Sequence, residues 1–199
     1  MRVRQALIQT AAWAAWAALA AGGCSKPADK AGAEGAASSS AAGAAAPGAW
    51  PSPPAACAFL DGRGYRHRGY KAYEPLRPDE FTCQSLNRKV GGGTAVVGEA
   101  GFYYSVVGGP DRAEYMRLRV DVVRGGADET VALDEFASTT AELAQRAFQA
   151  PLPDEAAAAL RAGAAGKWPL GEGHELKVER KKESGGPFGH VYSVIAELR

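Results

Sequence analysis

The chain has 199 residues, of which 46% are hydrophobic and 23% charged, which is enough material for one globular domain. Its formal net charge is +1, and without Arg2 and Arg4 the remaining 21 basic residues stand against 22 acidic ones. A near-neutral chain offers no general attraction for nucleic acid, so no nucleic-acid partner is predicted. Apolar and charged residues alternate only from residue 57 onwards, which predicts a single globular domain over 57–199.

Residues 1–23 have the composition of an export signal. Two arginines are followed by an apolar stretch and then by two glycines before Cys24. This order of basic, apolar and small residues is typical of secretory signals. The clean apolar run from Ala11 to Ala21 is shorter than the about 20 residues that a membrane-spanning helix needs. The segment is therefore predicted to be a signal peptide.

Small residues ahead of Cys24 resemble the signals of bacterial lipoproteins. The resemblance implies that signal peptidase II cuts before Cys24 and that lipid, such as palmitate, is attached to its sulfur. It also implies a protein anchored in the cell envelope. Ser25 stands where retained lipoproteins often have Asp, which favours the outer membrane, facing the periplasm. As an alternative, ordinary signal peptidase could cut after Ala20 and leave Cys24 as a free thiol.

The segment 25–56 consists mainly of Ala, Gly, Ser and Pro. Such a composition cannot form a core and predicts a disordered tether, which together with Cys24 makes up residues 24–56. As a flexible coil the tether would reach on the order of 30 Å. Trp50 is its only aromatic residue and is expected to be exposed.

The three cysteines support the anchor prediction. An odd thiol is a liability in an exported protein, and lipid on Cys24 would leave an even pair, Cys57 and Cys83. In an oxidising compartment this pair is expected to form a disulfide, worth roughly 3 kcal/mol.

Taken in chain order, the domain begins with a short helix predicted over 78–90, since Pro78, Asp79 and Glu80 suit a helix start. Two strands are predicted over 94–109, separated by glycine-rich turns. Over 114–123, apolar residues alternate with charged ones, which predicts a strand with one buried face.

Helical periodicity continues from Leu133 to Phe148, and a shorter helix is predicted over 151–163. The last two strands, 174–182 and 190–198, form a hairpin whose predicted register sets Lys177 opposite Glu197 and Leu176 opposite Leu198. The order α-βββ-αα-ββ predicts an α+β fold with a mainly antiparallel five-stranded sheet and helices on one face.

The domain lacks a recognisable catalytic or cofactor motif. The stretch after His174 begins like a zinc protease motif but lacks the second histidine, and on a strand His174 and Glu175 point to opposite faces. His67, His174 and His190 are the only histidines and are interpreted as structural or surface residues. No catalytic, cofactor-binding or metal site is therefore predicted.

One stretch, 61–77, interleaves arginines with tyrosines inside the loop that the disulfide would close. Such residues make effective recognition surfaces. Arg66, Arg68, Tyr65 and Tyr70 are the predicted partner contacts, with alternation placing the two arginines on one side. The alternative is a solvated loop whose tyrosines pack back on the domain.

The sequence thus predicts an exported, lipid-anchored binding module that holds an envelope protein or a glycan. A small periplasmic hydrolase and an enzyme inhibitor or immunity protein are the alternatives. A cleft of Asp, Glu or His with shifted pKa would favour the hydrolase. A protruding rigid loop would favour the inhibitor, and an extended grooved sheet face the accessory role.

Overall fold

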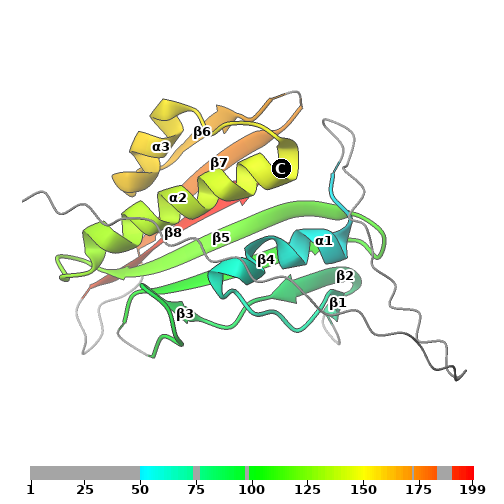
Figure 1. Cartoon of the computed structure of the whole chain (residues 1–199), viewed down its shortest axis with the longest axis horizontal. Coiled ribbons are helices and arrows are strands. Elements are labelled where there is room, and N and C mark those ends of the chain that lie inside the picture. The colour runs from blue at the N-terminus through cyan, green and yellow to red at the C-terminus, as the bar shows by residue number, and fades with distance from the viewer. Residues whose placement is uncertain (1–49, 74–76, 97–98, 172, 183–189) are drawn as a thin grey trace, which may run out of the picture. The chain divides into compact units, whose positions relative to one another are not determined.

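A computed structural model describes residues 50–73, 77–96, 99–171, 173–182 and 190–199 (Figure 1). Cys24, the predicted signal peptide and most of the predicted tether lie outside these residues. The helices are α1 (Pro53–Cys57), the 3₁₀ helix η1 (Ala58–Arg63), α2 (Glu129–Phe148) and α3 (Asp154–Arg161). The strands are β1 (Lys71–Tyr73), β2 (Arg77–Gln84), β3 (Arg88–Lys89), β4 (Gly101–Gly108), β5 (Ala113–Val123), β6 (Gly166–Pro169), β7 (Glu175–Lys182) and β8 (Val191–Leu198).

All strand pairs are antiparallel. The sheet has the order β1-β2-β4-β5-β8-β7-β6, and β3 pairs with β4 beside this path. The predicted α+β class with an antiparallel sheet is therefore confirmed. The predicted count of five strands is wrong, because the described residues form eight.

The predicted helix over 78–90 is also wrong. Its first half belongs to β2, which pairs with β4, and its end forms the short strand β3. Pro78 and the acidic residues after it suit a helix start, but pairing with β4 gives Thr82 and Cys83 buried positions that an isolated helix would not. Of the two strands predicted over 94–109, the described residues form only β4.

The strongest periodic patterns were predicted correctly. In β5 the alternating residues Met116, Leu118 and Val120 are fully buried, as expected from the sequence. In the last hairpin, Leu176 pairs with Leu198 and Lys177 with Glu197, which is the predicted register.

The helices cover one face of the sheet (Figure 1). Helix α2 lies against β5, α1 contacts β4 and β5, and α3 contacts β6. The buried face of α2, which includes Phe136 and Leu143, joins the buried residues of β5 in one hydrophobic core. We call this side of the sheet the helical face.

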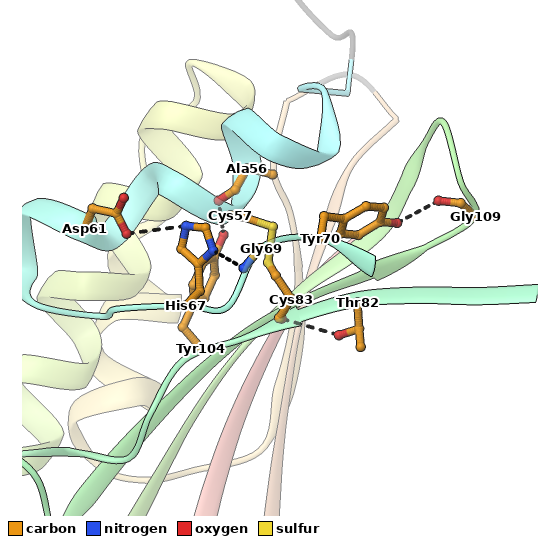
Figure 2. Close-up of a disulfide and its surroundings, with 10 residues drawn as sticks. All are labelled: Ala56, Cys57, Asp61, His67, Gly69, Tyr70, Thr82, Cys83, Tyr104 and Gly109. Carbon is orange, nitrogen blue, oxygen red and sulfur yellow. Dashed lines mark hydrogen bonds and ion pairs between the residues drawn. A yellow bond between two sulfur atoms is a disulfide. The ribbon is translucent and has the colours of Figure 1, made fainter. Parts of the chain in front are cut away.

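A disulfide between Cys57 and Cys83 joins α1 to β2, as the sequence predicted (Figure 2). The two Cα atoms lie 6.2 Å apart, and both residues are buried. Beside them, the hydroxyl of Tyr104 donates a hydrogen bond of 2.7 Å to the carbonyl oxygen of Ala56. The disulfide therefore fixes the first helix against the sheet.

Packing begins before the predicted boundary at Cys57. Trp50, which was expected to be exposed in the tether, is partly buried against the core. Its ring meets Phe148 edge-on, with 5.3 Å between the ring centroids. The tether prediction is therefore wrong for residues 50–56, because α2 offers an aromatic surface for Trp50.

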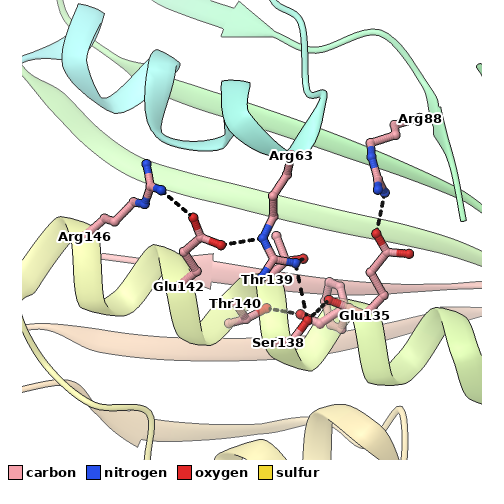
Figure 3. Close-up of polar contacts among 9 residues, drawn as sticks. Arg63, Arg88, Glu135, Ser138, Thr139, Thr140, Glu142 and Arg146 are labelled. Carbon is pink, nitrogen blue, oxygen red and sulfur yellow. Dashed lines mark hydrogen bonds and ion pairs between the residues drawn. The ribbon is translucent and has the colours of Figure 1, made fainter. Parts of the chain in front are cut away.

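Polar contacts also hold α2 in place (Figure 3). Arg63 of η1 pairs with Glu142 and donates a 2.9 Å hydrogen bond to the hydroxyl of Thr139. Arg88 of β3 pairs with Glu135 at 2.5 Å. These side chains are largely shielded from water, so the contacts lock α2 to two segments that are remote in sequence.

Candidate binding surface on the open face of the sheet

The predicted contact loop divides into a buried and an exposed part. Tyr65 is fully buried and meets Phe102 and Tyr104 edge-on, and burial raises its pKa. Tyr65 as a partner contact is therefore a wrong prediction, because the core lies directly beneath it. Tyr70 is half-buried, and its hydroxyl donates a 2.7 Å hydrogen bond to the carbonyl oxygen of Gly109.

Arg66 and Arg68 are both exposed, whereas Tyr65, which precedes them, is buried and His67, which lies between them, is half-buried. The predicted alternation is thus present in this loop. Arg68 lines a surface hollow, described below, together with Lys71. These arginines remain accessible candidates for a partner.

His67 lies next to the disulfide (Figure 2). Its Nδ1 accepts a 3.0 Å hydrogen bond from the amide of Gly69, and its Nε2 lies 3.6 Å from Oδ1 of Asp61. Both ring nitrogens therefore have partners within the protein, which does not suit a general base. Ligand atoms of Cys57, His67 and Cys83 lie within 4.8 Å of one another, but both sulfurs are committed to the disulfide.

His174 has a packing role. Its ring stacks on Phe148, with 3.9 Å between the ring centroids, and lies edge-on to Trp50. The aromatic cluster explains why a histidine begins the last hairpin. It belongs to the domain's packing, as the sequence interpretation held.

The face opposite the helices carries long polar side chains, and we call it the open face. Strand pairing places one row of residues side by side across it: Gln84, Ser105, Arg117, Glu197 and Lys177. Directly opposed residues of an antiparallel pair share a face, so these five side chains leave the sheet together. At about 4.8 Å per strand the row spans roughly 20 Å.

Three hollows follow this row. The first, of about 510 Å³, lies over β1 and β2, the second, of about 190 Å³, over β4 and β5, and the third, of about 230 Å³, over β5, β7 and β8. Gln84 lines both the first and the second hollow, and Arg117 lines both the second and the third. The three hollows therefore adjoin one another along the row, and we call them together the cross-strand groove.

The third hollow contains a network of four cations and two carboxylates. Glu197 accepts hydrogen bonds from both Arg117, at 2.6 Å, and Arg199, at 2.5 Å. Glu179 likewise lies 2.6 Å from Lys177 and 3.8 Å from Lys181. Each carboxylate thus pairs with two cations, so this part of the groove carries excess positive charge.

The network keeps its carboxylates ionised. Burial alone would raise the pKa of Glu197, but hydrogen bonds from Arg117 and Arg199 outweigh it, and the pKa lies below its usual value. The pKa of Glu179 is also lowered, chiefly by its hydrogen bond from Lys177. The groove therefore presents fixed charges near neutral pH rather than a group poised to exchange a proton.

This surface was not predicted from the sequence. Alternation in β5 indicated that Arg117 and Arg119 share a face, and the hairpin register paired Lys177 with Glu197. The pairing of β5 with β8, which joins the two halves of the row, has no local signal in the sequence. Arg117 and Glu197 are 80 residues apart.

Comparisons with known protein families, with curated proteins and with solved structures found no significant match for this chain. None of the helices in the described residues is long and apolar enough to cross a membrane.

Proposed function

We propose that this protein is an exported, lipid-anchored binding module of the cell envelope, which holds an envelope protein or a glycan on its open face. The observation that carries the proposal is the cross-strand groove, a set of three adjoining hollows along a row of side chains roughly 20 Å long, on the side of the sheet away from the helices. An extended groove suits an accessory protein that holds another molecule along its length.

The alternative functions have less support. A hydrolase needs a base with a free lone pair or a carboxyl of raised pKa, and His67 has both nitrogens engaged while Glu179 and Glu197 have lowered pKa values. An inhibitor needs a protruding rigid loop. The disulfide-closed loop instead packs Tyr65 into the core and ties Tyr70 to Gly109.

The binding role can be tested by crosslinking in cells. A photo-crosslinking amino acid at position 103, on the open face, is expected to yield adducts with a partner. The same amino acid at position 161, on the exposed side of α3, is the matched control and is expected to yield none. Adducts of equal yield at both positions, or none at 103, would contradict the proposal.

The anchor is tested by mass. We expect the intact protein in the membrane fraction to begin at Cys24 and to carry acyl groups, with two or more chains giving stable anchoring. Anchoring at the outer membrane, by the resemblance of the signal, would place the domain in the periplasm. Recovery of an unmodified soluble chain that begins at Ala21 would contradict the lipoprotein proposal.

A further inference from the structure

We infer that the cross-strand groove binds an acidic, extended peptide segment of a protein partner. This inference rests on the proposed function and names the chemistry that the same surface would recognise. Charge is the first argument. Seven cations line the three hollows: Arg68, Lys71, Arg117, Arg119, Lys177, Lys181 and Arg199. The acidic residues that line them are Glu179 and Glu197.

The cations are incompletely neutralised. Glu179 and Glu197 are each shared by two of them, and Arg119 pairs with Asp121 at 2.7 Å. At the other end of the groove, Arg68 and Lys71 enter no ion pair with the described residues. An anionic ligand would therefore meet excess positive charge at both ends of the groove.

The length of the groove favours an extended chain over a single ion. The positive charge extends over roughly 20 Å, which is about the length of six residues of extended peptide. The cations lie at different depths along this length, since the side chain of Lys177 is 30% exposed and that of Lys181 is 62% exposed. A small ion would occupy only part of this length.

The residues that lie beside the cations indicate that the bound chain is a peptide. The guanidinium of Arg117 lies 4.9 Å from the ring centroid of Tyr115, and that of Arg119 lies 5.7 Å from that of Tyr103. Paired arginine and tyrosine are enriched where proteins bind proteins. The planar guanidinium also matches a carboxylate with two parallel hydrogen bonds. Ile195, in the third hollow, adds apolar contact for a peptide's carbon chain.

The test uses a fluorescein-labelled hexaglutamate peptide and the purified full-length protein, with binding followed by fluorescence anisotropy. The groove variant combines Lys71→Gln and Lys181→Gln, two exposed residues at opposite ends of the groove, so its fold should be unchanged. The control variant combines Arg146→Gln and Arg161→Gln, which removes the same charge from α2 and α3. We expect at least tenfold weaker binding for the groove variant and less than twofold for the control.

Three results would overturn the inference. Equal weakening in both variants would show general charge attraction only, and undetectable binding of hexaglutamate to the unmodified protein would show that the ligand class is wrong. Groove-dependent binding of polygalacturonate or of phosphatidylglycerol vesicles, without binding of hexaglutamate, would replace the peptide by a glycan or a membrane. In each case, the crosslinking experiment in cells separates the two proposals. Adducts at position 103 would still support the proposed binding role, whereas the absence of adducts would contradict that role.

Discussion

The two faces of strand β5 are held in place by different forces. On the helical face Leu118 is fully buried in the core, while on the open face its neighbours Arg117 and Arg119 have side chains 40% and 36% exposed. The helical face is stabilised by the burial of apolar surface, which is a non-directional interaction. The open face is organised by ion pairs, which depend on the geometry of the two side chains and contribute little free energy when they are exposed to water. One face is therefore built for stability, and the other presents the charged groups that we propose to bind a partner.

The sharpest test of this contrast compares neighbouring residues of β5. Leu118→Ala should lower the free energy of unfolding by about 3 to 5 kcal/mol, because it leaves a cavity in a packed core. Arg119→Ala should cost less than about 1 kcal/mol, because its pairing with Asp121 is partly exposed. Urea unfolding followed by circular dichroism measures both, and similar losses would refute the difference between the faces.

The disulfide belongs entirely to the helical face. Replacing Cys57 and Cys83 together with Ser should lower the free energy of unfolding by about 3 kcal/mol, because the unfolded chain loses the constraint of a closed loop. Unfolding in the absence and presence of a reductant provides the comparison. The reductant should destabilise the parent protein and leave the double variant unchanged. Destabilisation of both to the same extent would mean that the pair does not act as a disulfide.

On the open face, the largest effect on stability is expected at Glu197. Glu197→Gln keeps the side chain's shape but removes the charge that Arg117 and Arg199 share. The free energy of unfolding should fall by about 1 to 2 kcal/mol at pH 7, measured by urea unfolding. Glu179→Gln, whose partners are two lysines on the same face, serves as a more exposed control and should cost less.

The same carboxylate makes stability depend on pH. Its pKa in the folded protein lies below the usual value, so its contribution is present above about pH 4.3 and is lost as the pH falls through the folded pKa. Thermal unfolding between pH 6 and pH 3 should therefore show a smaller loss of stability for Glu197→Gln than for the parent protein. Some loss will remain, because the pKa values of Glu99 and Glu129 are lowered as well. An unchanged pH profile would contradict this role.

The smallest effect on stability is expected for the cations proposed to meet a ligand. Lys71→Gln and Lys181→Gln should each change the free energy of unfolding by less than about 0.5 kcal/mol, because both side chains are exposed. Melting temperatures that match the parent protein within about 2 °C would confirm this. A clear loss of stability would mean that these lysines hold the fold and are not reserved for binding.

Local patterns in the sequence determined a large part of the helical face. The alternation in β5 and the helical spacing of Phe136 and Leu143 each identify a buried side without reference to the rest of the chain. The hairpin register followed from opposite charges and matched apolar residues on two neighbouring strands. The disulfide followed from the number of cysteines, since only one pair remains once Cys24 is assigned to the lipid.

Only the tertiary structure decided the rest, because it depends on which distant segments meet. Pro78 and the acidic residues after it favour a helix start, but this segment forms β2 because it pairs with β4. Trp50 and Tyr65 are buried against residues that are distant in the sequence. The cross-strand groove arises in the same way. Its row of side chains exists only once β5 lies beside β8 and brings Arg117 to Glu197, and no periodicity within either strand specifies that pairing.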